Sequence, residues 1–319
     1  MFALGSLLVI SAGELGTRLL VAEDEVLRWH DYGTQLKVDQ LASLVDDDRP
    51  PTVVIIGNSM AQQALVPDVL ARSDTTQPGE ADRYYNAALN GGVPVVMEPW
   101  VLDEIVPLAK PRRVIWGLSS IDLSATYGDA SATAYNTALS TRPGRLASMD
   151  RWISRHSRFV SSRAALRNPS AMWGSEGSAA RADLTAARAE LGRHGERRNF
   201  SINVSDERAA ELRQRIAPFA LDVDDLAAIV RTVDALRRQG IEVSLVELPV
   251  PPRFIELYPQ GAATHARFET AVARLAEDLD VAYVPLGAKA DAYGDGDFVD
   301  FTHLTEAAAI RFSHDLMAS

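Results

Sequence analysis

Short apolar runs alternate with longer amphipathic segments along most of this chain. Five of the apolar runs are expected to form strands, at residues 52–57, 83–89, 113–118, 241–248 and 281–286. The first run, TVVIIG, is typical of a strand buried on both faces. Helical spacing of apolar residues follows in 60–72, 94–109, a long segment ending at Gly240, 263–279 and 305–317. This alternation predicts a doubly wound, three-layer α/β/α sandwich around a mainly parallel five-stranded sheet.

The third and fourth predicted strands are separated by residues 119–240, and a connection of that length is not expected to be a single loop. Much of it is rich in Ser, Ala, Arg and Gly, with aromatic residues at Trp152, Phe159 and Trp173. We interpret 124–218 as a partly helical insertion that caps the carboxyl edge of the sheet. It belongs to an α/β domain spanning 30–319, which follows a hydrophobic N-terminal segment at 1–29.

The N-terminal segment allows two interpretations. Residues 2–22 are mostly apolar, but they include Glu14 and Arg18, and no basic residue precedes them. A membrane anchor needs about 20 largely apolar residues, which this segment reaches only if Glu14 and Arg18 pair across one helical turn. In that case the protein lies at the cell envelope, outside the cytoplasm. Otherwise the segment is an amphipathic helix packed on the domain, and a cytoplasmic location stays open.

Composition excludes several classes of function. The 319-residue chain carries 43 acidic and 32 basic residues, a net charge of −11, so nucleic acid is not an expected partner. It contains no cysteine, which excludes disulfides, thiolate metal sites and cysteine nucleophiles. Only three of the basic residues are lysines, which is typical of a GC-rich genome such as that of an actinobacterium.

The sequence shows no pattern for a metal or a nucleotide cofactor. No two histidines have the i,i+4 spacing of a zinc motif, and neither a phosphate-binding GxxxxGK[ST] loop nor a GxGxxG turn is present. Four aspartates, at positions 291, 295, 297 and 300, suggest a calcium loop but lack the EF-hand register, which favours a solvated turn. We therefore predict no cofactor.

Candidate chemistry gathers where the predicted strands end, the edge at which open α/β sheets bind ligands. Ser59 follows the first strand at the start of a helix, where its amide and the helix dipole can stabilise an oxyanion, although a serine there is also a common N-cap. Asp300 can reach Nδ1 of His303 and leave Nε2 facing outward. Alternatively, Asp300 or Thr302 caps the last helix and His303 is exposed in its first turn.

Three short sequence blocks together resemble those of the SGNH (GDSL-like) hydrolase superfamily. The resemblance implies a flavodoxin-like sheet. The blocks are the strand and turn IIGNS ending at Ser59, the segment YNAALNG ending at Gly91, and the DxxH pair Asp300 and His303. The resemblance implies that Ser59 is the nucleophile, His303 the general base and Asp300 its orienting carboxylate. It also implies an oxyanion hole formed by the amides of Ser59 and Gly91, with help from Asn90 or Ser119.

One more block of the family, which lies third in chain order between the YNAALNG segment and the DxxH pair, departs from the family pattern. Where the family has GxND, this chain has Gly117, Leu118, Ser119 and Ser120, so the oxyanion asparagine is missing. Ser119 is a shorter donor, and losing a good oxyanion donor costs on the order of 10²–10³ in rate. This departure puts efficient general esterase activity in doubt.

Within the superfamily, an N-terminal hydrophobic segment before a GNS turn resembles envelope acyl-transfer proteins, similar to the D-alanylation protein DltD and the alginate acetylation proteins. That likeness implies a serine esterase or O-acyltransferase that acts on acyl esters of cell-envelope carbohydrate, together with a membrane-bound O-acyltransferase. Two alternatives stay open: a soluble carboxylester hydrolase acting on small or lipid esters, and a non-catalytic binding partner of a membrane-bound O-acyltransferase.

Overall fold

The computed structural model describes residues 11–19, 32–74, 81–125, 127, 157, 159, 175–198, 204–216, 220–286 and 292–319. By their internal contacts, the residues form two compact units. The first combines residues 1–36 with 134–189, and the second combines 37–133 with 190–319. Helix α2 (Tyr32–Asp46) begins in the first unit and ends in the second. The predicted insertion lies mostly outside the described residues, as do Trp152 and Trp173.

The second unit contains a five-stranded sheet in the order β2-β1-β3-β4-β5, with every neighbouring pair parallel. The strands are β1 (Val53–Gly57), β2 (Tyr84–Asn86), β3 (Arg113–Leu118), β4 (Glu242–Glu247) and β5 (Ala282–Val284). All five match predicted runs, and β1 is buried along its whole length. The predicted doubly wound α/β fold is therefore confirmed, with the strand order of flavodoxin-like sheets.

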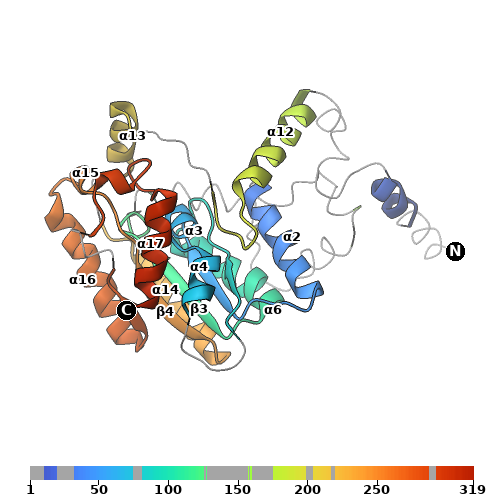
Figure 1. The fold of residues 1–319 in the computed structure, drawn as a ribbon, viewed down its shortest axis with the longest axis horizontal. Coiled ribbons are helices and arrows are strands. Elements are labelled where there is room, and N and C mark those ends of the chain that lie inside the picture. Colours follow the sequence, from blue (N-terminus) through green and yellow to red (C-terminus); the bar gives the residue numbers. More distant parts are fainter. Residues whose placement is uncertain are drawn as a thin grey trace. The chain divides into compact units, whose positions relative to one another are not determined.

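Helices cover both faces of this sheet. One face packs against α3 (Ser59–Ala64), α4 (Pro67–Ser73) and α17 (Glu306–Met317), which lie together in Figure 1. The core on that face includes Ile55, Ile115 and Val246. The other helices of the unit are α5 (Pro94–Pro99), the π-helix η2 (Trp100–Ile105), α6 (Val106–Ala109), α13 (Asp206–Ile216), α14 (Val223–Arg238), α15 (Pro252–Ile255), α16 (Ala262–Leu279) and the 3₁₀ turn η4 (Asp295–Asp297).

Two predicted elements differ from the structure. The helix expected at 60–72 is two helices, because Pro67 lacks an N–H and its ring keeps Val66 extended, with ψ of 106°. The second strand is shorter than expected and ends at Asn86. Beyond it the Leu89 N–H still donates to the Gly57 carbonyl at 2.9 Å, so the segment stays attached to β1 without continuing the ladder.

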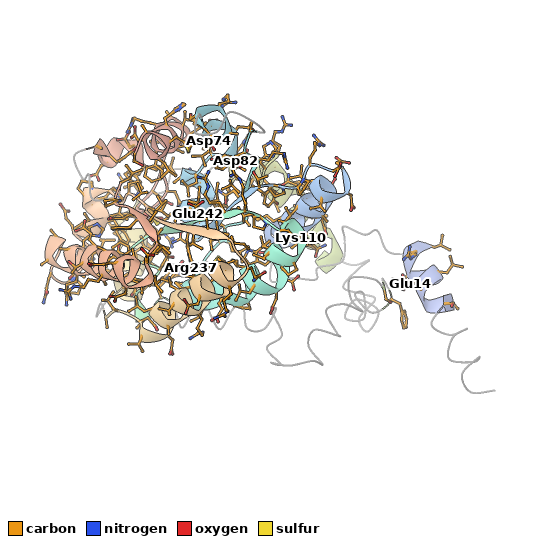
Figure 2. All side chains as sticks on the ribbon, turned by 90° about the horizontal axis from the view of Figure 1, so that it is seen from below. Glu14, Asp74, Asp82, Lys110, Arg237 and Glu242 are labelled. Atoms are coloured by element: carbon orange, nitrogen blue, oxygen red, sulfur yellow. The ribbon has the colours of Figure 1, made fainter. Side chains whose placement is uncertain are left out.

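A network of charges closes the amino edge of the sheet. Asp82 is almost fully buried just before β2, and its carboxylate pairs with Arg112 at 2.6 Å and Arg113 at 3.2 Å. Arg113 also lies 3.5 Å from Asp74, and the two aspartates are neighbours in Figure 2. The amino edge is thus a structural anchor and leaves the carboxyl edge for chemistry.

The described part of the first unit contains a short helix at residues 11–19 and α12 (Ser175–Glu190). Glu14 and Arg18 form the predicted i,i+4 pair at 2.8 Å. The other Glu14 oxygen accepts from the Ser157 hydroxyl at 2.8 Å and the Phe159 N–H at 3.1 Å. Among the described residues, no helix has the length and apolar character needed to cross a membrane.

Candidate active site

The β1–α3 turn fixes the position of Ser59. Gly57 has φ of 137°, and a Cβ there would collide with the Gly117 carbonyl oxygen and lie 2.8 Å from the Ala61 Cβ. Only glycine accepts that conformation and that approach without strain. Ser59 is then the first residue of α3, directly beyond the carboxyl end of β1.

Asn58, and not Ser59, caps α3. Its Oδ1 accepts from the N–H groups of Met60 at 2.7 Å and Ala61 at 3.4 Å. The alternative that Ser59 is merely the N-cap is therefore excluded. Because Asn58 takes the second and third amides of the helix, the first amide, that of Ser59, has no acceptor among the described residues. That N–H and the positive end of the helix dipole remain for an anion.

Ser59, His303 and Asp300 form a continuous hydrogen-bonded relay. Nε2 of His303 lies 2.9 Å from Oγ of Ser59, and Nδ1 lies 2.8 Å from Oδ2 of Asp300. The other Asp300 oxygen accepts from the N–H groups of Thr302 and His303, both at 2.7 Å. The side chain of His303 is 12% exposed and that of Asp300 14%. The structure thus brings the three residues together as a nucleophile, a base and an orienting acid would be placed.

The environment keeps Asp300 ionised. Burial opposes its charge, but the hydrogen bonds and the charge of His303, with the backbone donors of Thr302 and His303, outweigh it and lower the pKa of Asp300 to about 2. A carboxylate facing Nδ1 favours a proton on that nitrogen. Nε2 of His303 then has its lone pair toward the hydroxyl of Ser59, the tautomer that proton abstraction requires.

The capping alternative for the last helix is wrong. Thr305 caps α17, its Oγ1 accepting from the Ala308 N–H at 3.3 Å. Asp300 and Thr302 instead shape the loop before the helix. His303 is partly buried and points away from α17 to Ser59, so it is not an exposed residue of the first turn.

Arg253, at the start of α15, holds the loop that carries Asp300 and His303. Its guanidinium donates to the carbonyls of Asp300 and Phe298, and it lies 5.6 Å from the ring centroid of Phe301. This planar group satisfies two carbonyls while stacking on an aromatic face, which an ammonium cannot do. Sequence reasoning missed Arg253, whose only signal was its place after the fourth strand.

The predicted oxyanion donors Gly91 and Asn90 lie in one turn, at residues 89–92. The 89–92 turn lies against the carboxyl end of β1, since the Leu89 N–H donates to Gly57 and a Cβ on Gly92 would lie 2.9 Å from the Gly57 oxygen. Gly91 has φ of 71°, and its N–H has no acceptor among the described residues. Asn90 precedes it in the same turn and is exposed. Gly91 therefore offers a backbone donor near Ser59.

Ser119 has a different place from the one expected. It is fully buried, its Oγ donates to Oδ2 of Asp122 at 2.9 Å and accepts from Nδ2 of Asn58 at 3.1 Å. Because that hydroxyl is committed to Asp122, the structure does not present it to an oxyanion. Asp122 also accepts from Nδ2 of Asn58 at 2.6 Å. Ser119 and Asp122 thus orient Asn58, the cap of α3 and the residue before Ser59.

The carboxyl group of Asp122 is completely buried. Burial raises its pKa to about 7, against the hydrogen bonds from Ser119 and Asn58, which favour the charged form. Its oxygens accept from the Ser119 N–H at 2.7 Å, the Ser119 hydroxyl and Nδ2 of Asn58. Asp122 therefore positions Asn58. No role for Asp122 was predicted from the sequence.

The far end of α3 is anchored by Asn86. Its Nδ2 donates to the carbonyls of Leu65 at 2.9 Å, Ala61 at 3.0 Å and Gln62 at 3.3 Å. Gln63 adds a bond to the Leu304 carbonyl next to His303. A six-residue helix is unstable alone, so these contacts hold Ser59 in place.

The aspartates considered for calcium do not converge. Asp295 accepts from the Arg253 N–H at 3.2 Å, and Asp297 pairs with Arg311 at 2.9 Å. Asp300 belongs to the relay, and Asp291 lies outside the described residues. Each of the three described aspartates thus contacts a different residue.

The likeness of this chain to known proteins is distant. No family model matches the chain, and no curated protein matches it. Among solved structures, the crystal structure of TesA is similar over 83% of this chain and 96% of that chain, with 14% sequence identity and a TM-score of 0.40. At this distance the likeness carries no functional argument, so the assignment rests on the geometry of Ser59, His303 and Asp300.

Proposed function

We propose that this protein is a serine ester hydrolase or O-acyltransferase of the SGNH type. The observation that carries the proposal is the relay in which His303 joins Oγ of Ser59 at 2.9 Å to Oδ2 of Asp300 at 2.8 Å. It supports nucleophilic catalysis because the serine, its base and an ionised orienter are already aligned. The three sequence blocks that resemble SGNH hydrolases support the same assignment.

In the proposed reaction, Oγ of Ser59 attacks the ester carbonyl carbon while its proton passes to Nε2 of His303. The oxyanion is held by the amides of Ser59 and Gly91, and Asp300 stabilises the imidazolium. The carbon–oxygen bond to the leaving alcohol breaks, and that alcohol takes the proton from His303. The product of this half is an acyl ester of Ser59.

In the second half, water or an acceptor hydroxyl attacks the acyl group on Ser59. His303 takes the proton of the attacking hydroxyl and returns it to Oγ of Ser59 as the acyl bond breaks. Water gives hydrolysis, and a sugar hydroxyl gives O-acyl transfer. Exclusion of water from the acylated site decides between these outcomes.

The first test is labelling of the full chain with a fluorophosphonate, which reports an activated serine without knowledge of the substrate. We expect labelling of the wild type and none of Ser59→Ala or His303→Ala. A matched control is Ser73→Ala, because Ser73 also contacts a histidine, His314, at 2.8 Å, but at an exposed position. Ser73→Ala should label as the wild type does. A folded wild type that stays unlabelled would favour the non-catalytic binding partner instead.

We further propose that the substrate is cell-envelope carbohydrate, either as an acyl ester that donates the acyl group or as a hydroxyl that accepts it, with a membrane-bound O-acyltransferase as partner. Support comes from the resemblance of the GNS turn and the apolar N-terminal segment to envelope acyl-transfer proteins. In the test, protein acylated on Ser59 is mixed with a polysaccharide, either acetylated or deacetylated. Mass spectrometry then follows where the acyl group goes. Transfer to the polysaccharide supports this extension, whereas release of free acid alone supports the ester hydrolase acting on small or lipid esters.

A further inference from the structure

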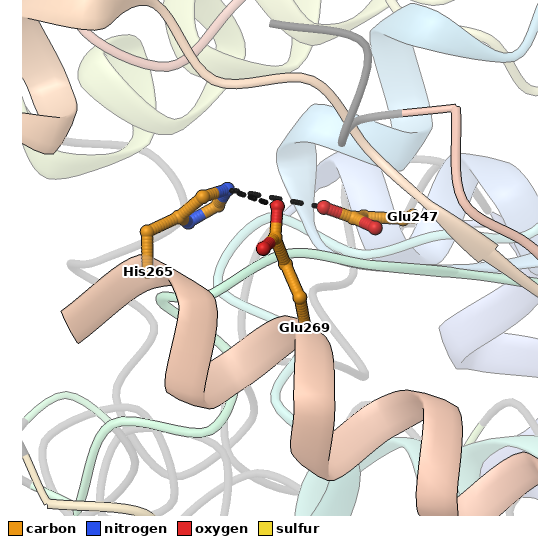
Figure 3. Close-up of side chains that lie close together, drawn as sticks. All are labelled: Glu247, His265 and Glu269. Atoms are coloured by element: carbon orange, nitrogen blue, oxygen red, sulfur yellow. Dashed lines mark ion pairs between the residues drawn. The ribbon is translucent and has the colours of Figure 1, made fainter. Parts of the chain in front are cut away.

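A second cluster of reactive side chains lies apart from Ser59. Glu247 is the last residue of β4, and His265 and Glu269 lie one turn apart on α16. Figure 3 shows the two α16 side chains pointing toward Glu247. Together they offer one imidazole nitrogen and two carboxylate oxygens, all within 4.8 Å of one another.

The spacing within this cluster is too wide for hydrogen bonds. Nε2 of His265 lies 3.5 Å from Oε1 of Glu269 and 3.8 Å from Oε1 of Glu247, whereas N–H···O bonds span about 2.7–3.2 Å. Ligands about 2.0–2.1 Å from a tetrahedral zinc ion stand about 3.3–3.4 Å apart. The two distances from Nε2 of His265 are close to that spacing, and all three ligand atoms lie within 4.8 Å of one another, which leaves room for a metal ion between them.

An unpartnered oxygen points into the gap. The Glu247 side chain is 0% exposed, and its Oε1 has no hydrogen-bond partner among the described residues. Its Oε2 accepts from the Tyr283 hydroxyl at 2.6 Å, which fixes the carboxylate with Oε1 toward His265. A buried carboxylate oxygen left unmatched is costly, and a cation would satisfy it.

We propose that Glu247, His265 and Glu269 form a binding site for a divalent transition metal, best matched by zinc. Mixed imidazole and carboxylate ligands suit zinc, whereas calcium and magnesium prefer oxygen alone. Glu269, with 32% of its side chain exposed, leaves a path for the ion and for a water as fourth ligand. Tyr283 orients Glu247 from behind the ligand shell, as outer partners of metal ligands do.

The charges around the cluster agree with this role. Burial and the charge of Glu269 raise the pKa of Glu247 to about 7, against the Tyr283 hydrogen bond, so a cation would relieve an unfavourable ionisation. Burial lowers the pKa of His265, which keeps the imidazole neutral and able to bind metal. The groups facing the cluster are Glu247 and Tyr283 from the sheet and His265 and Glu269 from α16.

The site lies on the face of the sheet opposite the nucleophile helix. Val246 packs in the same core cluster as Met60 and Ala61 of α3, and side chains alternate along a strand, so Glu247 points to the other face. A metal there would tie α16 to β4 and would not touch the relay. Loss of the metal is therefore expected to change stability while fluorophosphonate labelling of Ser59 persists, so the two proposals fail separately.

The test uses the full chain, stripped with EDTA and titrated with zinc while bound metal is counted by atomic emission. We expect one zinc per wild-type chain and at least tenfold weaker binding by Glu247→Gln and His265→Gln. His194→Gln is the matched control, because His194 also faces a carboxylate, Asp68 at 3.2 Å, outside the cluster. It should bind zinc as the wild type does.

Tyr283→Phe keeps all three ligands and serves if the ligand variants do not fold. We expect about tenfold weaker binding, as for loss of an outer-shell partner. Cobalt in place of zinc should give the visible absorption of a tetrahedral site. The proposal is overturned if the folded wild type binds no zinc, if Glu247→Gln and Tyr283→Phe both bind as tightly as the wild type, or if calcium is preferred.

Discussion

Nε2 of His303 lies 2.9 Å from Oγ of Ser59, although 244 positions separate the two residues in the chain. Ser59 follows strand β1, and His303 precedes α17, which packs on α3 and α4. The contact therefore exists only when the whole parallel sheet has formed and the last helix has docked on it. Activity of the relay should be a sensitive report of correct folding.

Asp300→Asn is expected to disable the site without dismantling it. The amide oxygen can keep the bonds from the Thr302 and His303 N–H groups, so the amide nitrogen must face Nδ1 of His303. Nδ1 of His303 then accepts a hydrogen bond from the amide, so the imidazole proton moves to Nε2. In that tautomer His303 cannot take the proton of Ser59. Turnover of p-nitrophenyl acetate should fall on the order of 10³–10⁴-fold.

The control for this variant is Asp297→Asn in the same loop. The side chain of Asp297 pairs with Arg311 and not with His303. Its turnover should stay within a few-fold of the wild type. Equal losses in both variants would mean that the loop, and not the tautomer of His303, is what the Asp300 substitution disturbs.

Arg253→Ala should loosen the loop that carries the acid and the base. It removes donors to the carbonyls of Phe298 and Asp300 and the contact with the Phe301 ring. Loss of such charge-assisted bonds costs about 1.5–3 kcal/mol, and misplacement of the base should lower kcat more than it raises KM. Esterase kinetics measure both constants.

Arg311→Ala is the matched control for Arg253→Ala. Arg311 also lies over an aromatic ring, 4.9 Å from the Tyr293 centroid, and pairs with Asp297. Its carbonyl contact is to Ala292 at 3.4 Å, not to Phe298 or Asp300. It should cost about 0.5–1 kcal/mol and leave kcat unchanged. A kcat as low as that of Arg253→Ala would show that general loss of packing explains both.

Asp122→Asn should weaken the cap of the nucleophile helix. Whichever way the amide turns, its nitrogen meets a donor, either Nδ2 of Asn58 or the N–H of Ser119. The mismatch costs about 1–3 kcal/mol and should slow fluorophosphonate labelling of Ser59. Asp82→Asn is the control, a buried acid at the opposite edge of the sheet, and should lower the denaturation midpoint without slowing labelling of the folded protein. Equal slowing in both would contradict a specific role for Asp122.

Much of the fold was predictable because its determinants are local. The apolar runs of β1, β3 and β4 match their strands closely, because a strand buried in a parallel sheet is a nearly continuous run of apolar residues that the sequence itself shows. The pair Asp300 and His303 was also readable, because three residues separate them and the loop brings them together. Ser59 was found by its place after β1.

The supports of the site were not predictable, because they join residues far apart in the chain. Arg253 contacts Asp300 across 47 positions, and Asn86 contacts Ala61 across 25. Nothing in the local pattern indicates either contact. Ser119 was misjudged because its partner, Asp122, lies in a turn whose shape the sequence left open. The Glu247 cluster was missed because the zinc motif was sought only as a pair of histidines, while His265 and Glu269 have the same i,i+4 spacing.

Gly57→Ala should prevent folding of the β1–α3 turn that carries Ser59. The residue has φ of 137°, and a Cβ would collide with Gly117. Gly240→Ala is the control, since Gly240 has φ of 75° and nothing lies within 4 Å of its added Cβ. Urea denaturation should show a loss of about 1 kcal/mol for Gly240→Ala and well above 3 kcal/mol, or no folded protein, for Gly57→Ala. Similar losses would mean that backbone conformation alone, without the collision, sets the requirement at Gly57.

Stability should fall as pH rises from about 5 to about 8 in EDTA, and Glu247 should account for part of the fall. Burial raises the pKa of Glu247 from its ordinary 4.5 to about 7, so in this window the folded chain holds a proton that the unfolded chain has released. Unfolding then releases a proton, and higher pH favours it. Glu247→Gln removes that proton and should flatten the dependence of the urea midpoint on pH. The pKa of Asp122, also raised to about 7, acts in the same direction and leaves a residual slope, whereas the lowered pKa of His265 opposes both acids below its ordinary value of 6.5. A Glu247→Gln midpoint that falls as steeply as that of the wild type would show that Glu247 is ionised in the folded protein throughout.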